Sequence, residues 1–122
     1  MNVLIVEDET DFRESLIEIL AIKGHDAIGI GSVSEFFLLS STHQFDLMVI
    51  DCSLPDGDGL QILREVRASC KVPIAVVSGA TELESSLDAL SKPDLFIKKP
   101  FAIQPLLAFI EKHARTLTKK NN

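Results

Sequence analysis

Polar residues that could carry out chemistry follow short apolar runs at four places in this chain. They are Glu7-Asp8 after Val3–Val6, Asp51 after Leu47–Ile50, Ser78 after Ile74–Val77, and Lys99 after Leu95–Ile97. The set combines carboxylates, a hydroxyl and an ammonium group. If the apolar runs are neighbouring parallel strands, these side chains meet where the strands end, which is where such sheets bind ligands.

Crowded carboxylates favour a divalent cation, because their repulsion raises their pKa values unless a cation neutralises them. Hard oxygen ligands suit Mg²⁺, with Mn²⁺ as the alternative, and Mg²⁺ typically takes one or two carboxylates together with phosphate oxygens. With the metal bound, a remaining oxygen of Asp51 could attack phosphorus and form an acyl phosphate. Lys99 could then stabilise charge on the transferred group, while Ser78 bonds a phosphate oxygen and Gly79 leaves room for it.

This chemistry requires elements that bring the strand ends together, and apolar runs do alternate with amphipathic stretches along the chain. The alternation predicts an α/β fold, a doubly wound parallel sheet with helices on both faces. The predicted strands are Val3–Val6, His25–Ile30, Leu47–Ile50, Ile74–Val77 and Leu95–Ile97. The predicted helices are Thr10–Lys23 ending at Gly24, a short one containing Phe36–Leu39, two striped by Leu60-Leu63-Val66 and Leu83-Leu87-Leu90, and one that begins just before Pro105 and runs towards Leu117.

The composition of the chain indicates the number of domains and excludes several kinds of partner. A chain of 122 residues suits one domain, and 25% charged and 46% hydrophobic residues are ordinary for a globular protein. The net charge of −6 argues against unaided binding to nucleic acid or anionic lipid. The acidic N-terminus is unlike a signal peptide and no apolar run is long enough to span a membrane, so we expect a cytoplasmic protein without membrane contact.

Four segments together resemble the receiver domain of bacterial two-component response regulators, over essentially the whole chain. They are Val6–Glu9, Asp51–Gly59, Val77–Ala80 and Phe96–Phe101. Each is weak evidence alone, but four in order, each at a predicted strand end, are specific. The resemblance implies a flavodoxin-like, three-layer domain over residues 1–118, with five strands in the order 2-1-3-4-5 and five helices. Residues 119–122 would be a polar tail or the start of a linker.

The resemblance also implies a function: Asp51 accepts a phosphoryl group from a sensor histidine kinase or a histidine phosphotransfer protein. It implies that Asp8, Asp51 and the backbone carbonyl of Ser53 hold Mg²⁺, with Glu7 acting through water. Such a domain is a switch and not a turnover enzyme.

The same resemblance assigns the remaining residues. Lys99 matches the lysine that contacts phosphate, and Ser78 and Phe96 match the switch pair. Gly79 and Ala80 would border the path to the phosphate. The responding face would consist of the fourth predicted helix, the fifth strand and the fifth helix, and the domain could form a homodimer through it. Ser91–Asp94 departs from the family pattern beside this face, so the output partner is left open.

Simpler interpretations stand beside these. Asp8, Thr10 or Asp11 could cap the first helix, Asp51 could be a turn residue, and Phe96 could be ordinary core. Gly29-x-Gly31 lacks the third glycine of a phosphate loop and is interpreted as a turn.

Two other functions fit the fold. A phosphatase of the haloacid dehalogenase type would need a second Asp two residues after the nucleophile, where this chain has Ser53. A flavodoxin would need a phosphate loop after the first strand, where this chain has Glu7-Asp8-Glu9, and this chain has no Trp or Tyr to stack on the flavin.

Overall fold

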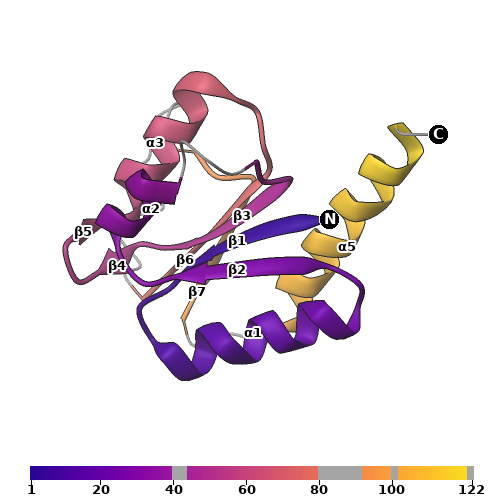
Figure 1. The fold of residues 1–122 in the computed structure, drawn as a ribbon, viewed down its shortest axis with the longest axis horizontal. Helices are drawn as coiled ribbons and strands as arrows, with labels where there is room; N and C mark the ends of the chain where they lie inside the picture. The colour runs from indigo at the N-terminus through magenta and orange to yellow at the C-terminus, as the bar shows by residue number, and fades with distance from the viewer. Residues whose placement is uncertain (40–43, 80–91, 100–101, 121–122) are drawn as a thin grey trace.

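Five parallel strands form the central sheet of the computed structural model, which describes residues 1–39, 44–79, 92–99 and 102–120 (Figure 1). They lie in the order β2-β1-β3-β6-β7. This is the expected order once a short antiparallel hairpin, which was not predicted, is left out of the count. The strands are β1 (Asn2–Val6), β2 (Asp26–Ile30), β3 (Leu47–Asp51), β6 (Ile74–Ser78) and β7 (Leu95–Lys98), and the hairpin is β4 (Ser53–Leu54) with β5 (Gly57–Asp58).

Helices cover both faces of the sheet, so the three-layer α/β/α fold is confirmed (Figure 1). The described helices are α1 (Thr10–Ile22), α2 (Val33–Leu39), α3 (Gly59–Ser69) and α5 (Gln104–Lys120). The predicted helix striped by Leu83, Leu87 and Leu90 lies outside the described residues. Among the helices that are described, none combines the length and apolarity needed to cross a membrane.

The strands alternate their side chains between two apolar cores, as period-two geometry requires. On one face α1 and α5 pack on the sheet through a cluster that includes Val3, Ile5, Leu16, Leu20, Val49, Leu106 and Ile110. On the other face α2 and α3 pack through a cluster that includes Leu4, Val6, Phe36, Met48, Ile50, Leu63 and Val66. Every residue of β3 and β6 is buried, including the polar residues Asp51 and Ser78 at their ends.

Helix ends differ from the sequence interpretation in two places. The N-cap of α1 is Glu9, whose side chain makes no capping bond, so the interpretation of Asp8, Thr10 or Asp11 as the cap is wrong. Asp11 lies in the first turn, where its charge interacts favourably with the helix dipole. α5 continues to Lys120, so residues expected in a polar tail extend the helix instead.

The C-terminal end of α1 follows the prediction. Gly24 has a φ of 89°, a left-handed conformation that glycine adopts without a steric penalty and that commonly ends helices. The chain therefore turns directly into β2.

A side chain from the hairpin caps α2. The Asp56 carboxylate accepts hydrogen bonds from the Val33 amide at 2.8 Å, the Ser34 amide at 3.0 Å and the Ser34 hydroxyl at 2.8 Å. These bonds, with the Ser34 amide contributing most, lower the pKa of Asp56 below its ordinary value. The hairpin that follows Asp51 is thereby fastened to α2, which lies more than twenty residues earlier in the chain.

We expect Asp56→Ala to lower the melting temperature at pH 7, because two amides at the start of α2 lose their acceptor. The pKa of Asp56 is lowered on folding, so its contribution is fully present above the unfolded-state pKa. It should disappear as the pH falls through the lower folded-state value. Thermal melts at pH 7, 4 and 3 measure this difference between variant and wild type.

Asp56→Asn is the matched control, because the amide keeps one acceptor oxygen and does not titrate. Its stability relative to Asp56→Ala should not vary with pH. Parallel melting curves for wild type and Asp56→Ala at every pH would contradict the capping role.

Candidate functional site

The parallel register brings the predicted site residues to one edge of the sheet. Val6 of β1 pairs with Ile50 of β3, so the residues that follow, Glu7 and Asp51, are neighbours. The backbone pairing then extends outwards: Asp51 pairs with Val77, Ser78 pairs with Lys98, and the Lys99 amide donates to the Ser78 carbonyl at 2.8 Å. In this last bond the ladder continues past the end of β7 and fixes the backbone of Lys99.

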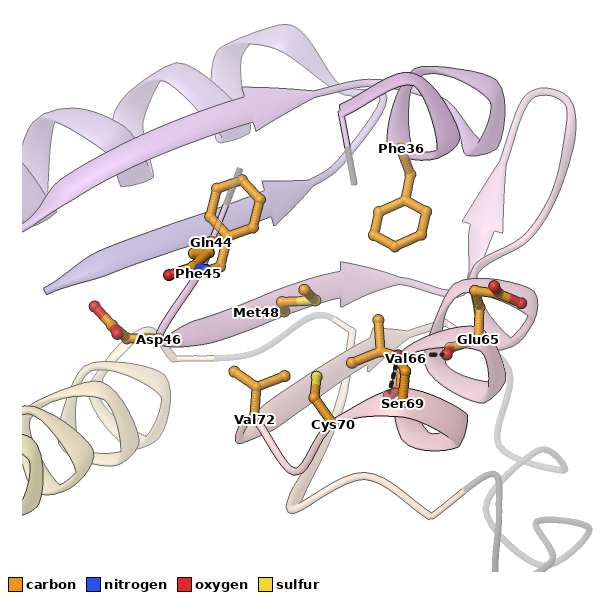
Figure 2. Close-up of a pocket in the computed structure, with 10 residues that line it drawn as sticks. All are labelled: Phe36, Gln44, Phe45, Asp46, Met48, Glu65, Val66, Ser69, Cys70 and Val72. Carbon is orange, nitrogen blue, oxygen red and sulfur yellow. Dashed lines mark hydrogen bonds between the residues drawn. The ribbon is translucent and has the colours of Figure 1, made fainter. Parts of the chain in front are cut away.

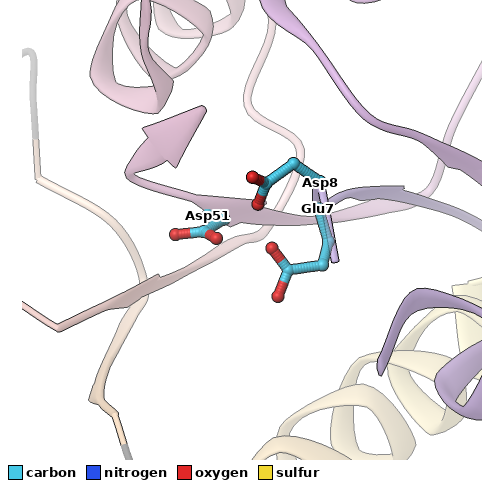
Figure 3. Close-up of side chains that lie close together, drawn as sticks. All are labelled: Glu7, Asp8 and Asp51. Atoms are coloured by element: carbon cyan, nitrogen blue, oxygen red, sulfur yellow. The ribbon is translucent and has the colours of Figure 1, made fainter. Parts of the chain in front are cut away.

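Three carboxylates converge at this edge. One oxygen from each of Glu7, Asp8 and Asp51 lies within 4.8 Å of the others, and Figure 3 shows the side chains turned towards a common space. Glu7 and Asp51 are both 3% exposed, whereas Asp8 is exposed. Oxygens on opposite sides of an octahedral Mg²⁺ are separated by about 4.2 Å, so small shifts would let this cluster hold such a cation.

Lys99 is the cation that contacts the buried carboxylates among the described residues. Its Nζ lies 3.0 Å from Asp51 Oδ2 and 3.3 Å from Glu7 Oε1. Burial by itself lowers the pKa of the Lys99 ammonium, but the hydrogen bond and charge of Asp51, followed by those of Glu7, outweigh burial and raise that pKa. Lys99 is therefore firmly charged beside Asp51.

The pKa of Glu7 is raised by its surroundings. Burial, followed by the neighbouring Asp51 carboxylate, raises the pKa of Glu7 to about 8, although Lys99 limits the rise. Its Oε2 is buried and has no hydrogen-bond partner in the described part of the chain. A buried, unsatisfied oxygen in an acidic cluster is what a hydrated divalent cation would satisfy, so the donor set fits such a cation.

A backbone amide two residues after Asp51 holds the Asp51 carboxylate. Its Oδ1 accepts the Ser53 amide at 3.0 Å, which leaves the Oδ2 side to Lys99. Gly59 lies directly against the backbone of Asp51, and a Cβ there would overlap the Asp51 carbonyl oxygen. The start of α3 thus approaches the acidic residue as closely as glycine allows.

The predicted switch residues lie on β6, which pairs with β3, and on β7 beside it. Ser78 is buried at the end of β6, and Phe96 pairs with Val76 in β7, where its half-buried ring packs against the core under α2 and α3. Among the described residues, no atom lies within 4 Å of the position that a Cβ on Gly79 would take. Ala80 lies outside the described residues.

Cys52 is a buried neighbour of Ser78. Burial, reinforced by the charge of Asp58, raises the pKa of its thiol to about 11, while the Ser78 hydroxyl acts in the opposite sense. Burial therefore keeps the Cys52 thiol protonated and unreactive.

Sequence reasoning missed contacts that depend on side-chain reach. It did not find the contact of Lys99 with Glu7, the close approach of Gly59, or the bond from Arg13 to the Glu7 carbonyl at 2.6 Å. The Asp58-Gly59 pair was the available signal for the second, since Asp58 caps α3 through the Leu60 amide. No local pattern pointed to Arg13.

A separate pocket of about 480 Å³ lies near the opposite end of β3 (Figure 2). It contains none of the predicted site residues. Its walls come from α2, α3 and the segments before β3 and β6, and comprise Phe36, Gln44, Phe45, Asp46, Met48, Glu65, Val66, Ser69, Cys70 and Val72.

Comparison with known proteins identifies the family. Residues 3–111 match the family model described as the response regulator receiver domain, and this chain belongs to that family. It is 34% identical over 113 residues to the swarming motility regulation protein RssB of Serratia marcescens, covering 91% of this chain and 52% of that protein. It is 36% identical over 108 residues to the KDP operon transcriptional regulatory protein KdpE of Escherichia coli, covering 88% and 48%. The chain thus spans about half the length of these relatives.

Solved structures agree with the family assignment. A two-component response regulator from Clostridium difficile is similar with a TM-score of 0.85 and 25% identity, covering 96% of this chain and 98% of that one. The response regulator protein TrrA from Thermotoga maritima, crystallised in complex with Mg²⁺-BeF, is similar with a TM-score of 0.81 and 25% identity, covering 92% and 97%.

We expect Lys99→Met to destabilise the metal-free protein by about 1–2 kcal/mol, since Asp51 and Glu7 lose their counter-charge. The value is well below that for a fully buried pair because Lys99 is 34% exposed. Urea denaturation in EDTA measures the free energy of unfolding.

Lys71→Met is the matched control, since Lys71 is an exposed lysine in the segment between α3 and β6. It should change the free energy of unfolding by less than about 0.5 kcal/mol. Equal losses for the two variants would show that the ion pairs of Lys99 contribute nothing specific.

Proposed function

We propose that this domain is a phosphoacceptor switch in which Asp51 receives a phosphoryl group from a phosphohistidine in a Mg²⁺-dependent reaction. The observation that carries the proposal is the row of Glu7, Asp8, Asp51 and Lys99 at one sheet edge, in a chain of the receiver family. The nucleophile, the oxygen ligands and the cation for phosphoryl transfer are thus adjacent.

The resemblance to the receiver family supplies the ligand set, and the cluster of three carboxylates supports it. Asp8, Asp51 and the backbone carbonyl of Ser53 would hold Mg²⁺, with Glu7 acting through water and Mn²⁺ as an alternative cation. When bound, the metal neutralises the carboxylates and the charge of the transferred group. This proposal accounts for the unsatisfied Oε2 of Glu7 and for the raised pKa of that residue.

Three residues of this chain would have different roles in the phosphoryl transfer. A carboxylate oxygen of Asp51 forms the new bond to phosphorus, the bond from phosphorus to the donor imidazole nitrogen breaks, and the imidazole keeps the electron pair. The Ser53 amide holds Asp51 in place through Oδ1. Lys99 already lies 3.0 Å from Oδ2, so its ammonium is placed to follow the negative charge onto the phosphoryl oxygens.

Transmission requires a group that detects the phosphoryl oxygens. Ser78 would turn its hydroxyl towards the phosphate past Gly79 and Ala80, and the Phe96 ring would move into the space that Ser78 leaves. The shared backbone pairing of β6 and β7 supports this coupling, since Phe96 lies two residues before the partner of Ser78. The responding face would be β7, α5 and the predicted helix around residues 83–90, which controls an output partner or effector domain and could support a homodimer.

Other properties follow from the same proposal. The donor would be a sensor histidine kinase or a histidine phosphotransfer protein in the cytoplasm, and this domain would bind neither nucleic acid nor membrane. The receiver domain would span residues 1–118, with the helical residues 119 and 120 leading onwards. It would not be a turnover enzyme, because Ser53 stands where a haloacid dehalogenase phosphatase has its second aspartate.

Asp51→Asn should abolish labelling by acetyl phosphate, because the amide keeps the shape of the side chain but is not a nucleophile. Wild type should be labelled on Asp51 alone, and only when Mg²⁺ is present. Intact-protein mass spectrometry with and without EDTA measures the added phosphoryl group.

Asp46→Asn is the control, because this carboxylate lies before β3 at the other edge of the sheet. Its labelling should equal that of wild type. Labelling of Asp51→Asn, or full labelling of wild type in EDTA, would overturn the assignment of the acceptor or of the metal.

Ser78→Ala and Phe96→Ala should leave labelling largely intact but reduce the structural response on the face formed by β7 and α5. Neither side chain belongs to the carboxylates and the ammonium that would carry out the transfer, so their loss should affect the two-state change more than the transfer. Amide NMR with and without beryllofluoride, which mimics the acyl phosphate, measures that response.

Wild-type shift changes in the Phe96 variant would show that the ring is ordinary core. Loss of labelling in the Ser78 variant would instead assign Ser78 to the transfer step.

A further inference from the structure

The Arg13 side chain crosses from α1 to the backbone of the acidic cluster. Its Nη1 donates to the Glu7 carbonyl oxygen at 2.6 Å, while the Glu7 amide donates to the Ile30 carbonyl of β2 at 2.9 Å. The arginine's acceptor therefore belongs to the peptide that joins Glu7 to Asp8. Glu7, the residue after the last β1–β2 pair, is thus fixed on one side by the sheet and on the other by α1.

The two glycines of β2's end provide the path for this side chain. A Cβ at Gly29 would lie 2.7 Å from Arg13 Cδ, 2.8 Å from Arg13 Cγ and 2.9 Å from Ile17 Cδ1, closer than real contacts allow. A Cβ at Gly31 would lie 3.2 Å from Arg13 Nη1, 3.7 Å from the Glu7 carbonyl oxygen and 3.8 Å from Asp8 Cα. The absence of a side chain at Gly29 and Gly31 thus leaves the space that the Arg13 side chain occupies, and the motif is not a phosphate loop.

We propose that Arg13 is a positioning residue for the metal site: by holding the Glu7 carbonyl it fixes the peptide that aims Asp8 at Asp51. Asp8 needs this support because it is exposed and follows the end of β1, so neither packing nor the ladder sets its direction. The inference rests on the proposed function, since it concerns the affinity of the same acidic cluster for Mg²⁺.

The sign of the effect separates positioning from charge. A guanidinium that acted only through its positive charge would repel Mg²⁺, so its removal would tighten metal binding. A guanidinium that orients a ligand does the opposite, because Asp8 then pays an ordering cost whenever it binds metal. We expect the second result.

Arg13→Met is the decisive variant, because methionine keeps an apolar stem over Gly29 and Ile17 but has no donor for the Glu7 carbonyl. We expect the dissociation constant for Mg²⁺ to rise about tenfold, which is the lower end of the effect seen when groups that orient metal ligands are removed. Calorimetric titration of the unphosphorylated protein measures it. Labelling by acetyl phosphate at saturating Mg²⁺ should stay within about twofold of wild type, since Asp51 and Lys99 are untouched.

Three further variants test the mechanism. Arg13→Lys restores a donor and should recover part of the affinity. Gly29→Ala should weaken binding in the wild-type background by displacing the Arg13 stem, but should add nothing in the Arg13→Met background. Arg115→Met removes the same charge from α5 and should leave the affinity unchanged. Arg115 acts on Glu111, whose partner His25 lies just before β2, at the other edge of the sheet.

The outcomes distinguish this inference from the function on which it rests. Equal Mg²⁺ affinity in folded Arg13→Met and wild type, or tighter binding in the variant, overturns the positioning role and leaves the proposed function standing. A wild type that binds no Mg²⁺ overturns both. A lowered melting temperature with unchanged Mg²⁺ affinity would make Arg13 a structural residue of α1 only, which also overturns the proposal.

Discussion

The repulsion between two buried carboxylates, Glu7 and Asp51, is the constraint on which the rest of the site depends. Both are 3% exposed, and only the ammonium of Lys99 contacts them as a counter-charge in the described structure. Lys99 does not fully offset the burial and the Asp51 charge, so the pKa of Glu7 stays raised. A cation added at this edge would relieve the repulsion and stabilise the folded domain.

The packing of the sheet keeps these charged groups close together. β3 is buried along its whole length, and Gly59 is packed against the Asp51 backbone, so Asp51 cannot retreat into solvent. Lys99 is fixed through its amide on the Ser78 carbonyl, which keeps its ammonium within reach of Asp51. A site whose groups are already placed loses little conformational freedom when it reacts.

Two helices are attached to the same edge through single side chains. Asp56 fastens the hairpin after Asp51 to the start of α2, and Arg13 fastens the peptide before Asp8 to α1. In both cases a charged group satisfies backbone groups that the regular ladder or helix leaves open. The loops that carry the acidic residues are therefore supported from both faces of the sheet.

The sequence alone determined the alternation of strands and helices along the chain and the edge of the sheet at which Asp8, Asp51 and Lys99 gather. These are consequences of periodicity and of the handedness of crossovers, which short stretches of sequence encode. Only the tertiary structure decided that Glu9 occupies the N-cap position of α1 without a side-chain cap, and that Gly29 makes room for Arg13. Such contacts depend on where long side chains end after distant segments have packed, and no local spacing records that distance.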